Sequence, residues 1–562
     1  MLRALAVTAA LFALPLIAGC AGARPPAPKT SPAIDAADLV LTGGEVITMH
    51  RDRPRAQAVA IVGDRVTAVG SDDEVRRFVG PRTRVIDLRG RTVTPGLVDA
   101  HCHLLGLGEA LESLSVRGLD TVAAVAEVVA RSARERPRGE WITGRGWDQN
   151  RFRPAVFPDH AALDAAAPEH PVALERIDGH ALWLNARALH AAGITRSTPD
   201  PAGGKIVRDA AGNPTGVLVD HAMDLAGRAM PTASPATRAR RIERAAALAV
   251  SLGLTGVHEM GIDDETASVY RALAREGKLP LRVYAYLAGA GSVHSLPSRR
   301  PDRDEAGTAV FVLRGIKLFA DGALGSRGAA LLAPYRDDPG NTGLVLTAAE
   351  DLARAAKIAA ESGFQLAVHA IGDRANRAVL DAFAAAGSGR DLRFRVEHAQ
   401  VLAPEDIPRF AALGVVASMQ PTHATSDMPW AEARLGPARI RGAYAWRSIL
   451  DTGAHVAFGS DFPIEDPSPL LGIHAAVTRQ DDRGEPAGGW TPSERITLEE
   501  ALRAFTVEPA WASFSEAQRG VIAAGMVADL TVFDRALGPD RSLREARAEV
   551  VIMGGRTTFE RR

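Results

Sequence analysis

Short β-rich runs alternate with helical stretches rich in Ala, Leu and Arg through the middle of this chain, and this alternation constrains the fold more than any other feature. A strand followed by a helix, many times over, is the pattern of βα units around a parallel sheet. The expected strands are residues 93–103, 255–259, 281–287, 315–319, 365–369, 394–398, 415–420 and 456–461, and the expected helices include 236–252, 348–362 and 375–386. This number of units favours an α/β fold with a closed (β/α)8 barrel over an open sheet.

The two ends of the chain carry a different pattern, with short alternating strands and turn signals. Gly63-Asp64 separates two β-rich runs and predicts a hairpin, and similar short runs return at 528–533 and 548–555. We therefore expect one β-sandwich built from residues 37–92 and 500–562, with the barrel spanning 93–499. Residues 141 to 235, approximately, are rich in Gly, Pro and short polar turns, and we interpret them as an insertion in the barrel.

The first residues have the features of an export signal. Arg3 supplies positive charge, and an apolar run that is too short to cross a bilayer leads to Ile17-Ala18-Gly19-Cys20. Small residues before a cysteine resemble a bacterial lipobox, in which residues 1–19 are removed and Cys20 becomes lipidated; an ordinary signal peptide is the alternative. Residues 20–36 are rich in proline and predict an extended tether. We expect an exported protein of the bacterial cell envelope, bound to the membrane through its lipid anchor.

Composition argues against nucleic acid as a partner and against a fold held by disulfides. Lys and Arg number 66 against 67 Asp and Glu, so the formal net charge of -1 gives no broad positive surface for nucleic acid. The two cysteines, Cys20 and Cys102, cannot build a disulfide framework. We expect a small-molecule substrate, and the oligomeric state stays open, with a homodimer as one option.

His101-Cys102-His103 is the sharpest local motif. Residues two apart on a strand point to the same face, so both imidazoles can reach one metal ion while Cys102 points away, where it is best explained as a small core residue. Two hydrogen-bonded histidines at a strand end are the alternative explanation of the motif alone.

Three further polar residues end expected strands: His369, His398 and Asp461. The carboxyl ends of barrel strands are where active sites of this architecture are assembled. Any one of them could be a half-buried polar group with a local partner. Three together with the paired histidines favour a functional site.

Lys317 is one of only five lysines, and it lies inside the apolar run 315–319. A buried ammonium is costly and repels metal ions. Carboxylation by carbon dioxide would convert it to an anionic carbamate whose two oxygens can bridge two cations. A neutral or paired buried lysine is the alternative.

In this order, the paired histidines, the lysine, two histidines and the aspartate resemble the binuclear-metal amidohydrolase superfamily. Residues 38–48, 94–103 and 525–530 are similar to its opening, first-strand and closing segments, and residues 317–329, 144–149 and 178–185 resemble its YtcJ-like branch, also called the amidohydrolase 3 group. The resemblance covers nearly everything after the tether. It implies a distorted (β/α)8 barrel with a β-sandwich, two divalent metal ions, usually zinc, and hydrolysis of C–N bonds.

Carried over to this chain, the resemblance implies that His101, His103 and Asp461 hold one metal, that His369 and His398 hold the other, and that carbamylated Lys317 bridges them. A hydroxide between the metals would attack the substrate carbonyl, and Asp461 would act as the catalytic proton acceptor and donor. If the lysine is unmodified, a one-metal site of His101, His103, His369 and Asp461 remains.

Weaker candidates for substrate binding come from two regions. Asp321, Ser326 and Arg327 lie in a glycine-rich loop after the lysine strand, where they could orient a polar substrate or support the loop. The second group belongs to the insertion and could line or cover the pocket: Trp147, Asp178 and His180.

The prediction is therefore a lipid-anchored metal-dependent amidohydrolase that cleaves an amide-like C–N bond, such as that of an N-substituted formamide or an N-acyl compound. A metal-dependent deaminase or isomerase with the same ligands is an alternative. A non-catalytic solute-binding lipoprotein is a further one, against which the complete ligand set argues.

Overall fold

The computed structural model describes residues 36–387, 391–538 and 542–561. Cys20 and the expected signal and tether, apart from residue 36, lie outside the described residues. Among the helices within these ranges, none is both long enough and apolar enough to cross a membrane.

Eight parallel strands form the central sheet, in the order β21-β20-β19-β18-β17-β16-β15-β8. Their bounds are β8 Leu97–Cys102, β15 Leu254–Ile262, β16 Arg282–Ala288, β17 Phe311–Phe319, β18 Gln365–Ala370, β19 Arg395–His398, β20 Val416–Met419 and β21 Val456–Phe458. The first and last strands approach each other just beyond their paired residues, because the Asp461 amide donates a hydrogen bond of 2.8 Å to the His101 carbonyl. The sheet is thus a nearly closed barrel, as the alternation predicts.

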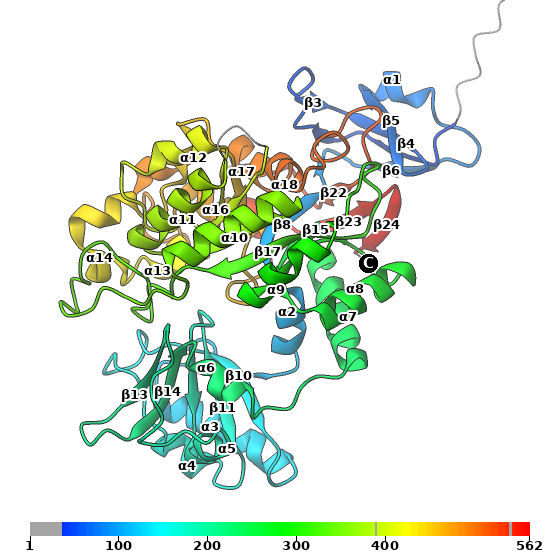
Figure 1. The fold of residues 1–562 in the computed structure, drawn as a ribbon. Helices are drawn as coiled ribbons and strands as arrows, with labels where there is room; N and C mark the ends of the chain where they lie inside the picture. The colour runs from blue at the N-terminus through cyan, green and yellow to red at the C-terminus, as the bar shows by residue number, and fades with distance from the viewer. Residues whose placement is uncertain (1–35, 388–390, 539–541, 562) are drawn as a thin grey trace, which may run out of the picture. The chain divides into compact units, whose positions relative to one another are not determined.

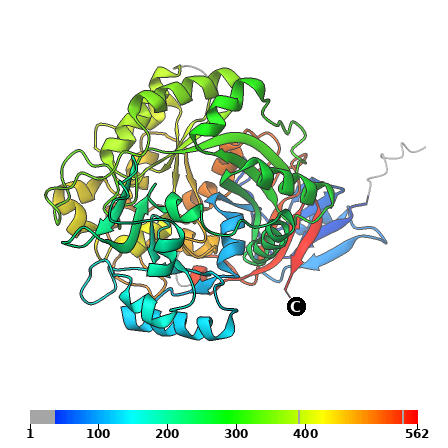
Figure 2. The same ribbon diagram turned by 60° about the horizontal axis from the view of Figure 1, so that its bottom comes forward.

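Helices lie outside the barrel strands, as Figures 1 and 2 show. In α10, Ala349–Ser362, buried apolar residues recur at Leu352, Ala355, Ala356 and Ala359, which is helical spacing. These helices are α2 Leu104–Ala110, α7 Pro235–Ser251, α8 Asp264–Arg275, α9 Gly289–Ser295, α10 Ala349–Ser362, α11 Asp373–Ala385, α12 Ile407–Leu413, α13 Pro421–Asp427, α14 Ala431–Arg439, α15 Trp446–Leu450, α16 Pro469–Thr478, α17 Leu498–Ala504 and α18 Val507–Ala512, with short 3-10 turns at Leu296–Ser298, Ile440–Gly442 and Pro492–Glu494.

Both chain ends contribute to one six-stranded sheet, in the order β24-β23-β22-β7-β2-β3. Its strands are β2 Glu45–Ile47, β3 Arg55–Ala56, β7 Thr92–Pro95, β22 Leu530–Phe533, β23 Ala548–Met553 and β24 Arg556–Glu560. A four-stranded sheet, in the order β5-β4-β1-β6, shares the apolar core of the composite sheet. Its strands are β1 Leu39–Thr42, β4 Ala58–Val62, β5 Arg65–Gly70 and β6 Arg84–Asp87. Short helices α1 Asp72–Arg76 and α19 Ser542–Glu545 accompany them. The composite sheet expected from the two ends is confirmed.

One boundary differs from the expectation. Helices α17 and α18 fall mostly within the range 500–562, yet they contact barrel strands β21 and β8. Their short apolar segments pack against the barrel wall, and the strands of the composite sheet resume only at Leu530.

The insertion has a six-stranded sheet and a core of its own, in the order β13-β14-β12-β11-β10-β9. Its elements are β9 Leu114–Ser115, α3 Val122–Glu135, β10 Ile142–Trp147, α4 Ala161–Ala166, β11 Val172–Arg176, β12 Ala181–Leu184, α5 Ala186–Ala191, β13 Gly204–Arg208, β14 Pro214–Asp220 and α6 Met223–Gly227. The sheet begins at Leu114, earlier than the expected start near residue 141. The reason is that β9 has two residues, too few for a sequence pattern, and α3 is amphipathic like a barrel helix.

Candidate metal centre

The six expected ligands meet at the carboxyl end of the barrel. His101 and His398 lie in their strands, β8 and β19, and their ring centroids are 4.7 Å apart; the His369 ring, from β18, lies 4.7 Å from that of His398. Lys317 Nζ, from β17, is 3.5 Å from His101 Nε2. Parallel strands end at the same edge, so residues far apart in the sequence converge here.

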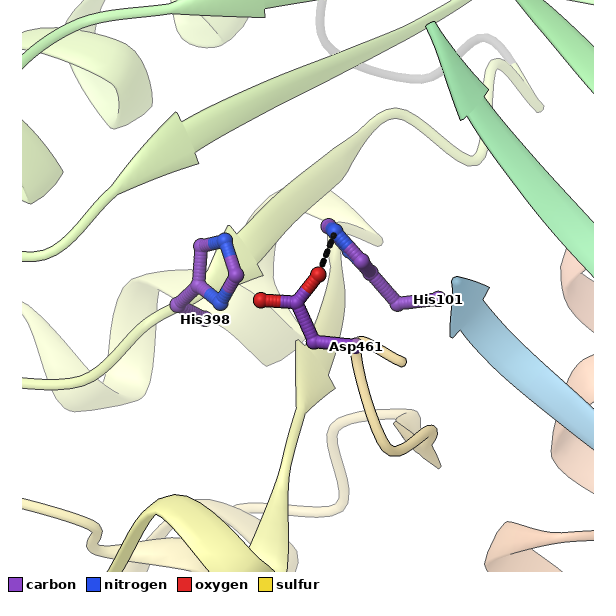
Figure 3. Close-up of side chains that lie close together, drawn as sticks. All are labelled: His101, His398 and Asp461. Carbon is purple, nitrogen blue, oxygen red and sulfur yellow. Dashed lines mark ion pairs between the residues drawn. The ribbon is translucent and has the colours of Figure 1, made fainter. Parts of the chain in front are cut away.

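His101, His398 and Asp461 form the most compact group (Figure 3). One ligand atom from each lies within 4.8 Å of the others, and all three side chains are buried. Asp461 Oδ1 is 3.4 Å from His101 Nε2 and 3.1 Å from the Nε2 of His103, which follows β8. Ligands about 2 Å from a common ion have such separations.

A divalent cation fits these residues. Among the described residues, Asp461 Oδ1 is buried without a hydrogen bond of acceptable geometry. A buried carboxylate oxygen in that state is costly unless something else neutralises it. Imidazole nitrogens with a carboxylate oxygen are a typical donor set for zinc and similar metals.

Three of the imidazoles are in the protonation state that metal binding requires. Burial, and then nearby positive charge, holds the pKa of His369 and of His398 well below its ordinary value. Burial and the Lys317 charge lower the pKa of His101 as well. These three rings are therefore neutral at pH 7 and offer a free lone pair.

Buried partners fix the direction of two rings. His101 Nδ1 lies 2.6 Å from Glu397 Oε2, and a carboxylate accepts, so Nδ1 donates and Nε2 points into the site. Glu397 in turn accepts from Arg395 Nε at 2.8 Å. His398 Nδ1 donates to Gln420 Oε1 at 2.7 Å in the same way.

Lys317 is a buried amine without a counter-ion. Its side chain is 1% exposed, and no carboxylate of the described residues lies within salt-bridge distance of Nζ. Burial lowers its pKa to about 8. About a tenth of the amine is therefore uncharged and nucleophilic at pH 7, far more than for an ordinary lysine.

Two of the ligands are held in a strained backbone conformation. His398 has φ 71° and Asp461 has φ 59°, a left-handed region that costs a residue other than glycine about 1–2 kcal/mol. Asp99 supports the second turn: its carboxylate accepts from the Ser460 amide at 3.0 Å and hydroxyl at 2.7 Å, and from the His101 amide at 3.0 Å. Burial raises the pKa of Asp99 to about 7.

Sequence reasoning missed His423, which comes from α13. Its Nε2 is 3.7 Å from Asp461 Oδ2, and its ring stacks on that of His398 with centroids 5.8 Å apart. This buried nitrogen has no hydrogen-bond partner among the described residues. The available signal was its position three residues beyond Gln420, where an expected strand ends. Asp99 and Glu397 were missed too, although both belong to strands that carry ligands.

His180 is the substrate-binding candidate that lies beside the ligands. Its ring is 5.0 Å from that of His369 and 6.5 Å from that of Phe319. Nδ1 lies 2.6 Å from Asp220 Oδ1. Burial lowers the pKa of His180, but the hydrogen bond and charge of Asp220 outweigh it and raise the pKa to about 9.

The other candidates have local partners. Trp147 is buried in the core of the insertion and donates from Nε1 to the Leu174 carbonyl at 2.7 Å. Asp178 pairs with buried Arg176, and Arg327 pairs with Asp337. Asp321 accepts from the backbone amides of Ala330, Ile371 and Gly372, and Ser326 Oγ donates to the Ala323 carbonyl. These contacts support loops and the insertion.

Asp321 is nevertheless close to one ligand. Its Oδ1 lies 3.5 Å from His369 Nε2, and burial raises its pKa to about 7. The backbone amides that surround it connect the loop after β17 to the loop after β18. Asp321 therefore fixes the position of two strand ends that carry ligands.

The chain matches a known family over most of its length. The family described as "Amidohydrolase family" matches residues 84–559. The chain is 37% identical over 497 residues to the putative amidohydrolase YtcJ of Bacillus subtilis, covering 87% of this chain and 93% of the relative. It is 32% identical to the N-substituted formamide deformylase of Arthrobacter pascens, covering 91% of this chain and 97% of that one.

The fold is also similar to that of a solved structure. The crystal structure of an uncharacterized metal-dependent hydrolase from Pyrococcus horikoshii superposes with a TM-score of 0.72 at 27% identity. The match covers 89% of this chain and 97% of the other.

Proposed function

Because this chain belongs to the amidohydrolase family and has the buried ligand cluster of a metal-dependent hydrolase, we propose that it hydrolyses an amide-like C–N bond. The substrate class is that of N-substituted formamides or N-acyl compounds. The observation that carries the proposal is the convergence of the His101 and His103 imidazoles on the buried oxygen of Asp461 that has no hydrogen-bond partner among the described residues. The substrate class draws on the similarity to a deformylase across nearly the full length of both chains.

Two zinc ions are the proposed cofactors, one held by His101, His103 and Asp461 and the other by His369 and His398. When bound, such ions lower the pKa of water and polarise a carbonyl. We propose that Lys317 is carbamylated and bridges them. The uncharged amine forms a bond to the carbon of carbon dioxide and releases one proton, and the lowered pKa of Lys317 favours this reaction.

Asp461 is the proposed proton carrier. Oδ1 faces His101 and His103, while Oδ2 faces His423. The carboxylate takes a proton from the attacking water and delivers it to the leaving nitrogen. The strained turn held by Asp99 keeps the carboxylate in position for both transfers.

His180 is the proposed substrate contact among the insertion residues. With a pKa of about 9 it is protonated at neutral pH and can donate a hydrogen bond to a polar substrate group. The Phe319 ring beside it supplies an apolar wall. We retain Asp178, Arg327, Ser326, Asp321 and Trp147 as residues that position the pocket through the contacts described above.

We propose that the enzyme acts in the bacterial cell envelope, anchored through lipidated Cys20, on a small molecule. The lipobox-like run before Cys20 and the proline-rich segment after it support this location.

The test is a hydrolysis assay with zinc-loaded protein. N-substituted formamides and N-acyl amines are offered beside aminated heterocycles, and release of carboxylate, amine or ammonia is measured. We expect carboxylate and amine from one of the first two groups, and loss of turnover after chelation. Ammonia release from the heterocycles alone would instead establish a deaminase.

A further inference from the structure

A second hollow, here called the lower cavity, lies at the opposite end of the barrel from the candidate metal centre. It has a volume of about 50 Å³ and is partly open to solvent. Its walls come from the amino-terminal halves of β8, β15, β16 and β17 and from α18 with the segments that follow it. Since the expected ligands lie at the carboxyl ends of the strands, the lower cavity is separate from their site.

Most of the lining is apolar. The apolar part of the lining includes Val98, Val257, Val283, Val312, Val527 and Ala510. A wall of this kind suits a short hydrocarbon chain.

His258 lines the cavity and offers an unused donor. Its Nδ1 lies 2.8 Å from Arg395 NH1. A guanidinium can only donate, so Nδ1 accepts and the ring proton of the neutral imidazole is on Nε2. Burial and the Arg395 charge hold the pKa of His258 well below its ordinary value, which keeps the ring neutral. Within the described residues this Nε2–H has no hydrogen-bond partner, although the side chain is 2% exposed.

Arg519 offers the second donor. One of its terminal nitrogens bonds Asp304 Oδ2 at 2.9 Å, but its buried Nε has no partner in the described part of the chain. The other lining arginine, Arg282, is bonded to both oxygens of Asp529, at 2.7 and 3.1 Å. A buried donor left without a partner is destabilising, because it has lost its hydrogen bonds to water.

The lining therefore has more hydrogen-bond donors than acceptors available to them. Among the residues that the structure describes, the buried side-chain oxygens that lack a partner all belong to residues outside the cavity. An occupant with acceptors and no donors matches this imbalance, and an anion forms the stronger hydrogen bonds.

We propose that the lower cavity binds a small aliphatic carboxylate, with its oxygens accepting from Arg519 Nε and His258 Nε2 and its chain against the valines. The site is independent of the proposed hydrolase function, because none of its lining residues belongs to the expected metal ligands.

Location is the first test, because a carboxylate can also bind to metal ions. Crystals of zinc-loaded protein are soaked with 3-bromopropionate, and the bromine is found by anomalous scattering. We expect a peak in the lower cavity, with or without one at the metal centre. A peak at the metal centre alone, or no peak, would overturn the proposal.

Affinity is the second test, measured by calorimetry with propionate and with propionamide, which has the same shape but no charge. We expect saturable propionate binding in solution and at least 10-fold weaker binding of propionamide. Equal binding of the two would refute a carboxylate site.

Arg519→Met removes a donor from the cavity. Asp304, the partner of Arg519, still accepts hydrogen bonds from the backbone amides of Thr308 and Ala309. We expect at least 10-fold weaker propionate binding. Arg271→Met, which breaks a pair with Asp302 outside the cavity, is the matched control and should leave binding unchanged. An unchanged affinity in Arg519→Met would contradict the proposal.

Gly256→Leu fills the space instead. A Cβ at Gly256 would meet Val98 Cγ2 at 3.4 Å and the Arg282 carbonyl at 3.6 Å, which are ordinary contacts. We expect propionate binding in the cavity to be lost, whereas Gly291→Leu, at an open position, should retain it. If circular dichroism shows that Gly256→Leu is unfolded, the bromine position and Arg519→Met decide the question.

Discussion

At the residue scale, the candidate site depends on a few buried groups whose chemistry is set by their neighbours. Asp461 touches two imidazoles with one oxygen and faces a third with the other, so one carboxylate can hold a cation and move a proton. Lys317 has a buried amine where a counter-ion is absent among the described residues. Each of these properties can be tested by a separate substitution.

Asp461→Asn separates proton transfer from metal holding. The amide keeps the shape and one oxygen ligand but cannot accept the proton. We expect metal content close to that of the wild type and kcat lower by about 10²–10⁴. Metal analysis with steady-state kinetics measures both, and exposed Asp451→Asn serves as the control. Turnover close to wild type in a metal-loaded Asp461→Asn enzyme would assign the proton to another group, such as His423.

Lys317→Ala tests the bridging carbamate. We expect loss of at least one metal ion and of most activity, and partial recovery of both when a short carboxylic acid replaces the carbamate. The recovery should persist in the double variant with Arg519→Met, because the lower cavity lies elsewhere. Two metal ions and normal turnover in Lys317→Ala would exclude the bridge.

The raised pKa of His180 leads us to expect that the stability of the metal-free protein depends on pH. Its pKa of about 9 is raised above the unfolded value of about 6.5. Its contribution is therefore complete below pH 6.5 and is lost as the pH rises through 9. His180→Gln should be less stable than wild type at pH 6, by at most about 3 kcal/mol from this shift. Urea unfolding should show the difference shrinking toward pH 9.5; a constant difference would mean that His180 acts by packing alone.

At the element scale, one buried arginine connects five strands of the barrel. Arg395, on β19, bonds the Ala100 carbonyl of β8, His258 of β15, Tyr286 of β16 and Ser418 of β20. The same guanidinium holds Glu397 and thereby orients His101. The polar interior of the barrel thus links strand packing to the ligand geometry.

Arg395→Met should be strongly destabilising. It leaves the Glu397 carboxylate buried with only His101 beside it, a situation that typically costs about 3–5 kcal/mol. Zinc affinity should fall about 10- to 100-fold, since the support of a ligand is lost. Denaturant unfolding and metal titration measure these effects. Arg271→Met, at an exposed pair, should change stability by about 1 kcal/mol or less. Similar stability in both variants would contradict the role assigned to Arg395.

The strands and several of the expected ligands could be read from the sequence because these ligands lie close to the end of an apolar run. His101, His369 and His398 each lie within two residues of such an end. The roles of Asp99 and Asp220 could not be predicted from the sequence, since a carboxylate on a strand is common and its partner is known only from the fold. The start of the insertion at Leu114 was also hidden, because a two-residue strand has no periodicity.

At the scale of the whole molecule, the composition of the chain bears on the partners that it can attract. A nearly neutral chain gives no general attraction to polyanions. Attachment to a membrane would then depend on the amino-terminal segment.

Cys20→Ser should release the enzyme from the membrane fraction and leave its activity intact. A single acyl chain anchors only weakly, so firm attachment requires the several chains of a lipoprotein terminus. Cell fractionation followed by the hydrolysis assay measures both properties, with Cys102→Ser, a buried core position, as the control for partition. Unchanged membrane attachment in Cys20→Ser would exclude the anchor.

The composite sheet has a consequence for how the protein is made. Strand β7 pairs with β2 on one side and with β22 on the other, so Thr94 lies opposite Thr531. Chains are synthesised at about 5–20 residues per second, so β7 waits on the order of tens of seconds for its second neighbour. During that time its open edge is available to other chains. A ribosome that stalls before Leu530 therefore leaves a product with an incomplete sheet, whatever the state of its barrel.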